Sequence, residues 1–226
     1  YDADVFKRFP RIRLVSRIGI GVDAIDLQAA KIHGIHVYNT PSAPSRSVAE
    51  QVICFIVGLA RGFFHMNTDF HKKSWSPLIG REIASLRIGL LGFGRIGHMV
   101  AERLQPFGCL TMACDPVWDS EKASQFNVKR MELKELLAES DILSLHLPLE
   151  AGTRHYISAS QFKQMQSGSF IINTSRGGII DDTALIKNLR NGHLSGAALD
   201  VFETEPPSDK EFLSLPNLMV TPHIAG

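Results

Sequence analysis

A short apolar segment that runs into three glycines is the feature that most restricts how this chain can fold. Residues 86–91 read LRIGLL, and Gly92, Gly94 and Gly97 follow with the spacing G-x-G-x-x-G. Residues 95–104 then carry the apolar period of a helix. In this context the first glycine allows a tight turn, the second lets the backbone approach a pyrophosphate, and the third lets the helix pack on the strand. The helix N-terminus offers unpaired N–H groups to the anion.

An acidic residue follows where a dinucleotide site requires one. Residues 109–114 form a second apolar run that ends at Asp115, 18 positions after Gly97 (115 − 97). A carboxylate at the tip of the second strand accepts hydrogen bonds from the adenosine ribose and would repel a 2′-phosphate, so the sequence predicts NAD rather than NADP. The alternative is an ordinary strand, turn and helix with an acidic surface residue.

Composition and charge exclude several other classes of function. The 226 residues are 44% hydrophobic and 21% charged, which is typical of a soluble globular protein. A net charge of +1 gives no field that would attract nucleic acid, and the longest apolar run, residues 52–60, is too short to cross a bilayer. We therefore expect no nucleic-acid partner and no membrane. Cys54, Cys109 and Cys114 lie inside apolar patterns and are expected to be core residues of a reducing, cytoplasmic protein.

The first part of the chain predicts a partial domain of its own. Its expected elements alternate between helix and strand: residues 2–9, 12–16, 26–33 and 36–38. Gly19 and Gly21 lie in a loop between them and can turn backbone N–H groups outward to hold an anion. A proline-punctuated link at residues 39–45 places a boundary between domains at 1–41 and 42–226.

A long apolar helix is expected directly after this link. Ser47 and Glu50 form the S-x-x-E pattern of a capping box, which predicts a helix over residues 47–70. Apolar residues surround that helix on nearly all sides, so one core-facing stripe does not explain it and a second surface must cover the rest. We expect a homodimer through this helix and the glycine-containing domain. Burial against the chain's other domain explains the pattern equally well.

Short helices alternate with apolar strands in the remainder of the chain. The expected strands are residues 141–148, 169–173 and 195–200, and the expected helices are residues 132–139, a helix starting at the capping box of Ser158 and Gln161, and residues 182–189. Nearly continuous apolar strands between helices indicate a parallel sheet covered on both faces. The sequence therefore predicts an α/β fold whose main part is a doubly wound, parallel-sheet Rossmann domain.

Three ionisable residues follow strands of this predicted sheet. Arg176, Glu205 and His223 each stand after an apolar run. Any one of them alone would be interpreted as a surface loop residue. Because ligands bind beyond the carboxyl ends of parallel strands, all three together around one dinucleotide predict a catalytic group.

The segments that carry these residues resemble the D-isomer-specific 2-hydroxyacid dehydrogenases. The similar motifs are residues 19–23, 39–41, 92–97, 173–178, 198–206 and 221–226. The resemblance implies hydride transfer between NAD(H) and a D-2-hydroxyacid or its 2-oxoacid, with His223 exchanging the proton, Glu205 holding its imidazole ring and Arg176 pairing with the substrate carboxylate. It also implies that residues 1–41 are the remnant of a flavodoxin-like substrate domain.

The same resemblance implies a set of binding residues. Those expected at the cofactor are Gly92, Gly94, Arg95, Ile96, Gly97, Asp115, Leu147, Pro148, Thr174, Ser175, Asp200, Ala225 and Gly226. Within this set Asp200 would orient the nicotinamide carboxamide. Those expected at the substrate are Arg17, Ile20, Gly21 and Arg176.

The substrate itself is open at this stage. The resemblance implies a role for Arg17, because the family branch that acts on D-3-phosphoglycerate has an arginine at this place that helps to bind the substrate phosphate, a task that suits a guanidinium group. We therefore expect that branch, although arginine also occurs here in relatives that act on other substrates. The alternatives are a reductase of the glyoxylate, hydroxypyruvate or D-lactate type and, in another class, an NAD-sensing transcriptional corepressor with a dehydrogenase fold. No metal site is expected, because His33 and His36 stand on either side of a helix end without a Cys or acidic cluster.

Overall fold

The structure, a computed structural model, describes the backbone of all 226 residues and every side chain except those of Lys210 and Glu211. Its contacts divide the chain into two compact units, residues 1–47 with Gly226 and residues 48–225. This division lies six residues beyond the boundary expected after residue 41 (47 − 41), and that domain boundary stays a prediction.

The first unit is a small βαβ arrangement preceded by a helix. Its elements are α1 (Ala3–Arg8), β1 (Leu14–Arg17), α2 (Leu27–Ile32) and β2 (His36–Asn39). β1 and β2 pair in parallel, with Leu14 opposite His36. The side chains of Asp2 and Asp26 accept hydrogen bonds from the first turns of α1 and α2, which explains where both helices begin. All four expected elements are present, and their ends differ by at most two residues.

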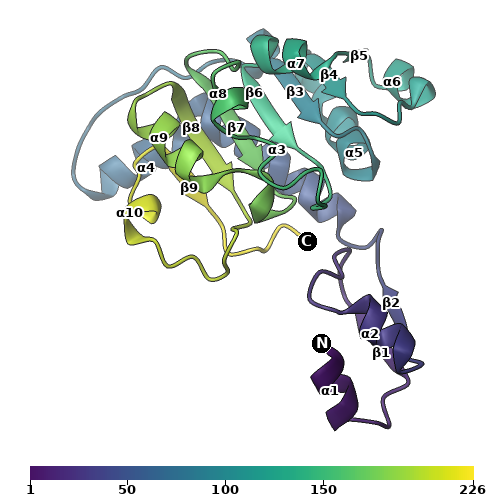
Figure 1. Cartoon of the computed structure of the whole chain (residues 1–226). Coiled ribbons are helices and arrows are strands. Elements are labelled where there is room, and N and C mark those ends of the chain that lie inside the picture. Colours follow the sequence, from purple (N-terminus) through teal and green to yellow (C-terminus); the bar gives the residue numbers. More distant parts are fainter. The chain divides into compact units, whose positions relative to one another are not determined.

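The second unit is built on a seven-stranded parallel sheet with the order β5-β4-β3-β6-β7-β8-β9. The strands are β3 (Arg87–Leu91), β4 (Leu110–Cys114), β5 (Val128–Arg130), β6 (Ile142–Leu145), β7 (Ser169–Asn173), β8 (Leu194–Leu199) and β9 (Leu218–Val220). The strand order reverses between β3 and β6, the place where ligands bind in doubly wound sheets. The predicted doubly wound sheet is confirmed (Figure 1).

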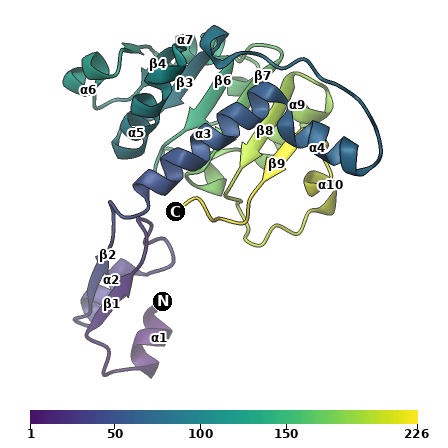
Figure 2. The same cartoon turned by 180° about the vertical axis from the view of Figure 1, so that it is seen from behind.

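Helices cover both faces of this sheet. The helices after residue 44 are α3 (Ser45–Arg61), α4 (Phe63–His71), α5 (Arg95–Leu104), α6 (Ser120–Gln125), α7 (Leu133–Glu139), α8 (Ala159–Phe162), α9 (Asp182–Arg190) and α10 (Lys210–Leu213), with short 3-10 turns η1 (Ile83–Ser85), η2 (Gln105–Phe107) and η3 (Gly177–Ile179). Figure 2 shows α3 lying across one face of the sheet with α5 beside it, whereas α7, α8 and α9 lie on the other face.

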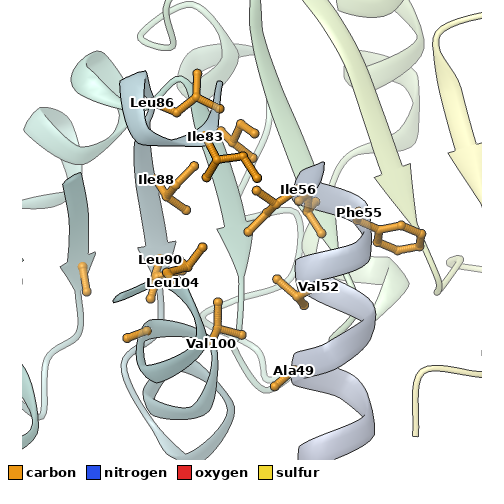
Figure 3. Close-up of a cluster of buried hydrophobic side chains, with 14 of the residues drawn as sticks. Ala49, Val52, Phe55, Ile56, Ile83, Leu86, Ile88, Leu90, Val100 and Leu104 are labelled. Atoms are coloured by element: carbon orange, nitrogen blue, oxygen red, sulfur yellow. The ribbon is translucent and has the colours of Figure 1, made fainter. Parts of the chain in front are cut away.

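Alternation along the strands produces two separate cores. Leu90 of β3 packs with Val52 and Ile56 of α3 and with Val100 of α5, all fully buried (Figure 3). The next residue, Leu91, belongs to the cluster under α7 and α9 on the opposite face. Successive residues of a strand point to opposite faces, so an apolar run without polar breaks is what a sheet covered on both sides requires.

The expected helix over residues 47–70 is wrong in two respects. It is two helices, bent by 67° and separated at Gly62, whose φ of +62° ends α3. The helix also begins at Ser45, so Ser47 lies inside its first turn and the predicted capping box is wrong. Among the helices that the structure describes, no single one is long and apolar enough to cross a membrane; the bent pair passes only when its two helices are counted together.

The cysteines differ from the expectation as well. Cys54 is exposed, and Cys109 and Cys114 are only partly buried; all three are free thiols. The prediction of a core position is therefore wrong for Cys54. The reason lies in α3, whose apolar residues surround the helix while only one side of it packs on the sheet.

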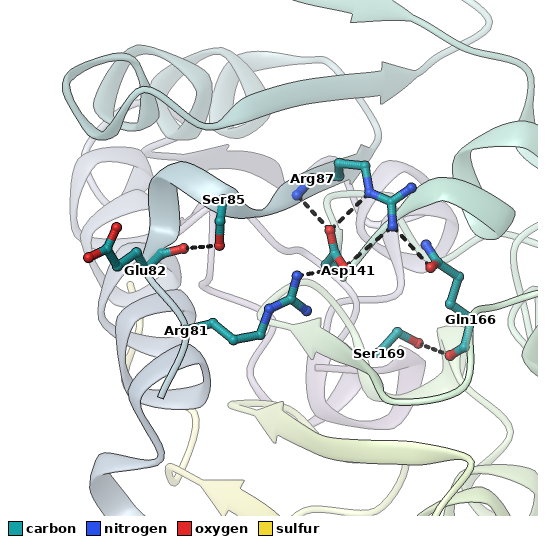
Figure 4. A network of polar contacts seen from close by, with 7 residues as sticks. All are labelled: Arg81, Glu82, Ser85, Arg87, Asp141, Gln166 and Ser169. Atoms are coloured by element: carbon teal, nitrogen blue, oxygen red, sulfur yellow. Dashed lines mark hydrogen bonds and ion pairs between the residues drawn. The ribbon is translucent and has the colours of Figure 1, made fainter. Parts of the chain in front are cut away.

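A buried carboxylate joins three segments at the amino-terminal edge of the sheet. Asp141, at the start of β6, is 8% exposed and accepts hydrogen bonds from the backbone N (2.8 Å) and Nε (3.0 Å) of Arg87 and from Nη2 of Arg81 (3.0 Å) (Figure 4). Arg87 also donates to Gln166 (3.0 Å). Burial alone would raise the pKa of Asp141, but the hydrogen bonds from both arginines outweigh it and the pKa lies below its ordinary value.

Replacing this carboxylate should destabilise the second unit. Asp141→Asn removes the charge that two arginines share, and because both arginine side chains are half exposed we expect a loss of about 2 kcal/mol in the free energy of unfolding. Urea titration at pH 7 measures it, with the exposed Glu82→Gln as control. Because the pKa of Asp141 is lowered in the folded chain, its charge stabilises the fold at pH values above the ordinary pKa of an aspartate. The difference in stability between the native protein and Asp141→Asn should therefore shrink as the pH falls below about 4. An unchanged midpoint would contradict the assignment.

Candidate active site

The glycine loop joins β3 to α5 at the carboxyl edge of the sheet. Gly92 has a φ of +101°, and a Cβ there would lie 2.5 Å from the carbonyl oxygen of His146. A Cβ on Gly97 would lie 2.5 Å from the carbonyl oxygen of Gly92, so this glycine lets α5 approach the strand. A Cβ on Gly94 would meet nothing within 4 Å. The described chain therefore leaves open space at Gly94, beside the N-terminus of α5 where Arg95 and Ile96 begin the helix.

Asp115 lies at the tip of β4 and is bonded to this loop. Its Oδ2 accepts a hydrogen bond from the backbone N of Phe93 (2.7 Å), and its Oδ1 accepts one from the backbone N of Val117 (2.7 Å). A carboxylate has about four acceptor sites, so it keeps capacity for further donors such as ribose hydroxyls. The same bonds fix the distance between the acid and the glycine loop.

A buried asparagine shapes the turn that presents Arg176. Asn173, 1% exposed at the end of β7, donates from Nδ2 to the carbonyl of Arg176 (2.8 Å) and accepts at Oδ1 from the backbone N (3.0 Å) and Oγ (2.8 Å) of Ser175. The turn is thereby closed on both sides. Sequence reasoning gave Asn173 no role of its own, although an Asx residue at a strand end is a known turn signal.

A buried carboxylate holds the segment that carries His223 by hydrogen bonds. Asp200, 1% exposed at the end of β8, accepts hydrogen bonds from the hydroxyl of Thr221 and from the backbone N of Ile224 (2.9 Å) and Ala225 (2.9 Å). These three bonds use most of the acceptor capacity of Asp200. The structure thus assigns Asp200 a structural function that the sequence did not predict, namely holding the turn around His223.

His223 and Glu205 meet at hydrogen-bond distance. Nδ1 of His223 lies 2.7 Å from Oε2 of Glu205, and the other oxygen of Glu205 accepts from the backbone N of Phe202 (3.1 Å). Their side chains are 47% and 38% exposed, so Nε2 of the imidazole can reach a ligand. His223 has a φ of +53°, uncommon for a residue with a Cβ, and the bonds to Asp200 keep the backbone there. The pair has the geometry of an imidazole oriented by a carboxylate.

Polar side chains without partners continue the row of strand ends. His146 follows β6 and its backbone N donates to Leu91 (2.7 Å), while Thr174 follows β7. Both ring nitrogens of His146 and the hydroxyl of Thr174 are buried and find no hydrogen-bond partner among the residues that the structure describes. Burial lowers the pKa of His146 to about 4, so its ring is neutral at pH 7. Leu147 is half-buried and Pro148 exposed beyond it.

The expected substrate residues lie in the first unit. Arg17 ends β1, and Ile20 and Gly21 lie in the loop after it. Gly19 donates its N–H to the hydroxyl of Thr40 (2.9 Å), so the predicted anion cradle is wrong for Gly19, whose amide is already used. A side-chain bond from Asn39 to the carbonyl of Ile20 (2.7 Å) fixes the same loop. Gly226 groups with this unit, while Ser175 and Ala225 belong to the second.

Comparisons with known proteins identify what this arrangement is similar to. A family model described as "D-isomer specific 2-hydroxyacid dehydrogenase, NAD binding domain" matches residues 53–225. A hydroxypyruvate reductase of Thermotoga maritima is 40% identical over 99% of this chain and 74% of its own length. A D-3-phosphoglycerate dehydrogenase of Bacillus subtilis is 36% identical over 99% of this chain but only 43% of its own length. The crystal structure of a D-lactate dehydrogenase from Aquifex aeolicus, complexed with NAD and lactic acid, superimposes with a TM-score of 0.88 at 32% identity, covering 98% of this chain and 72% of that one.

The neutral His146 predicts an acid-sensitive fold. Its pKa is about 4 in the folded chain and 6.5 ordinarily, so between these values the unfolded chain binds a proton that the folded chain does not. Stability should fall as the pH drops from 6.5 to 4, by as much as about 3 kcal/mol from this residue. In His146→Leu this contribution to the fall of stability with pH should be missing. In His71→Gln, which changes an exposed histidine, it should remain. Urea titrations across this pH range measure both, and equal slopes in all three proteins would refute the assignment.

Proposed function

Because this chain belongs to the D-isomer specific 2-hydroxyacid dehydrogenase family, whose members are NAD-dependent oxidoreductases acting on CH–OH groups, we propose that Arg176, Glu205 and His223 are its catalytic residues. The observation that carries this proposal is the 2.7 Å contact between Glu205 and His223 at the carboxyl edge of a dinucleotide-type sheet. A group there that can give or take a proton is what reduction of a keto oxygen or oxidation of a hydroxyl requires.

Each of these residues would contribute a separate part of the reaction. His223 exchanges the proton with the substrate oxygen through Nε2, and Glu205 holds the ring by Nδ1. Arg176 pairs with the substrate carboxylate, for which its planar, permanently charged fork is suited. Asn173 and Asp200 act one step further back, because they fix the turns on which Arg176 and His223 stand.

The glycine loop fits the cofactor that the family binds. The open space at Gly94 and the amides of Arg95 and Ile96 at the start of α5 would hold the pyrophosphate, and Asp115 would accept from the adenosine ribose. Leu147 and Pro148 would face the adenosine, and Thr174, Ser175 and Asp200 would lie near the nicotinamide. The bound nicotinamide supplies the hydride acceptor or donor, and the chain supplies position and charge.

For the substrate we propose D-3-phosphoglycerate or a close relative. Support comes from Arg17, a permanently charged donor able to pair with phosphate, and from a relative that carries the name D-3-phosphoglycerate dehydrogenase. Ile20 and Gly21 would hold the carboxylate with backbone amides. The relative named hydroxypyruvate reductase is of similar identity, so glyoxylate, hydroxypyruvate or D-lactate are the competing substrates.

We also propose that two copies associate through α4 and the segment after it. This stretch exposes six large apolar side chains: Phe63, Phe64, Phe70, Trp75, Leu78 and Ile79. Monomers rarely leave so many large apolar residues together in water. A cavity of about 590 Å³ opens beside them, lined by Gly58, Phe64, Leu78 and Met219 among others, and it offers room for apolar side chains of the second copy. A twofold axis would let the patch cover itself.

The substrate proposal is tested by NADH formation in the full-length protein with D-3-phosphoglycerate and D-lactate in parallel. Arg17→Ala should raise KM for phosphoglycerate about 10- to 100-fold and leave D-lactate oxidation unchanged, because only the former loses a charged partner. His223→Asn, as a reference, should lower kcat at least about 100-fold on any substrate. If the rates on both substrates are equal and Arg17→Ala does not change them, the phosphoglycerate proposal is refuted and the protein is a general 2-hydroxyacid dehydrogenase. Absence of turnover together with NAD-driven association would favour a corepressor.

The association is tested by light scattering. The native protein should have twice the mass of one chain, and Trp75→Ser combined with Ile79→Ser should have the mass of one, because the change removes two apolar side chains of the patch that are 82% and 98% exposed. The contact that Trp75 loses within the chain is an edge-on one with the ring of Phe70, which is itself exposed. Val117→Ser, which changes an equally exposed apolar residue elsewhere, should remain dimeric. A monomeric native protein would refute the interface.

A further inference from the structure

A cluster of charged residues outside the catalytic set joins two loops at the same edge of the sheet. Glu203, in the loop after β8, accepts a hydrogen bond at Oε1 from Nη2 of Arg154, and its Oε2 lies 3.3 Å from Nε2 of His155. Arg154 and His155 belong to the loop after β6. Burial and the neighbouring Glu203 raise the pKa of Asp182, at the start of α9, to about 6.

The glycines after Arg176 bring these loops together. A Cβ on Gly177 would lie 1.9 Å from the carbonyl carbon of Phe202 and 2.3 Å from the backbone N of Glu203. On the other side, a Cβ on Gly178 would lie 3.3 Å from Nη1 of Arg154, and the backbone N of His155 donates to the carbonyl of Gly178 (2.8 Å). The loops after β6, β7 and β8 are therefore in contact at the two glycines that follow Arg176 in the sequence.

The same short segment leads from Glu203 to the candidate catalytic pair. Glu205 is two residues further on, and it bonds back to the N–H of Phe202 (3.1 Å) and out to His223 (2.7 Å). One end of residues 202–205 is thus held by the charged cluster and the other end by the imidazole. Only one residue separates Glu203 from Glu205, so a shift of the backbone at Glu203 should also move Glu205.

The exposure of the cluster argues against a purely stabilising role. The side chains of Arg154, His155 and Glu203 are 55%, 42% and 31% exposed. Ion pairs this open to solvent contribute little to the free energy of unfolding. His155 also has a φ of +49°, a conformation that its bond to Gly178 maintains. The arrangement restrains the position of a loop more than it supports the fold.

We propose that Glu203, held by Arg154 and His155, is a positioning residue that keeps Glu205 in register with His223. The proposal rests on the function proposed above. None of the three residues touches the reacting atoms; they act through the segment 202–205 and through Glu205. A misplacement of about 1 Å at a catalytic group can cost as much as 100-fold in rate, so a restraint of this kind is large enough to measure.

The test is a double-mutant cycle in the full-length protein. Glu203→Gln should lower kcat about tenfold, with KM for NADH and the unfolding midpoint nearly unchanged. In a Glu205→Gln background the same change should cost nothing further, because the group it positions is already gone. Arg154→Lys should retain more activity than Arg154→Met. Glu150→Gln, an exposed carboxylate of the same loop, is the matched control and should behave as the native protein. If Glu203→Gln lowers kcat by the same factor in the Glu205→Gln background as in the native protein, the two residues act independently and the proposal is overturned.

Imidazole ¹⁵N spectra provide a readout that does not need turnover. Glu203→Gln should move the ring signals of His223 toward those of Glu205→Gln, and Glu150→Gln should leave them in place. Unmoved signals in Glu203→Gln would overturn the positioning role whatever the kinetics. A native protein without turnover on any 2-oxoacid would overturn the proposed function instead, and the spectra would then decide the positioning role by themselves.

Discussion

The candidate site depends on two buried polar side chains that end neighbouring strands. Asn173 and Asp200 are each 1% exposed; the bonds of Asn173 described above go to the turn that follows β7, and those of Asp200 go to the segment just beyond β9. Hydrogen bonds to a buried carboxylate are worth about 1.5–3 kcal/mol each, so the turn around His223 has few alternative conformations. Functional side chains can then stand on loops and still have defined positions.

The alternation of the sheet explains why this polar row is tolerated. Ile142, Ile172 and Ala198 lie in the core under α3, and two residues later on the same faces come Ser144, Thr174 and Asp200. On this face of β6, β7 and β8, a buried apolar side chain is therefore followed by a polar one toward the carboxyl end of the strand. At the opposite edge Asp141 is paired with two arginines, whereas Ser144, His146 and Thr174 keep buried polar atoms that have no hydrogen-bond partner among the described residues.

Local patterns predicted most of this fold, and they failed where a distant contact decides. β7 and α5 have the residues expected of them, because a continuous apolar run and a glycine turn are unambiguous signals. At Gly62 the left-handed φ ends α3, and a Cβ there would lie 2.5 Å from the distant side chain of Leu78. A single glycine in an apolar run does not by itself predict such a break. α6 and β5 are too short to show a period. Arg154 and Glu203 are 49 positions apart, so no spacing rule connects them.

The candidate site likewise separates the groups that anchor it from those that we propose as catalytic. Groups that fix geometry, such as Asp200, are buried and have their bonds satisfied within the chain, whereas Glu205 and His223 remain 38% and 47% exposed. If the imidazole of His223 were completely buried, a substrate could not reach it. If the loops that carry His223 and Glu205 were mobile, the 2.7 Å contact between the two side chains would be lost. An exposed pair on a rigid base satisfies both conditions. The loop bearing Arg154 contacts this base, which is why we propose that it positions the pair without contacting a ligand.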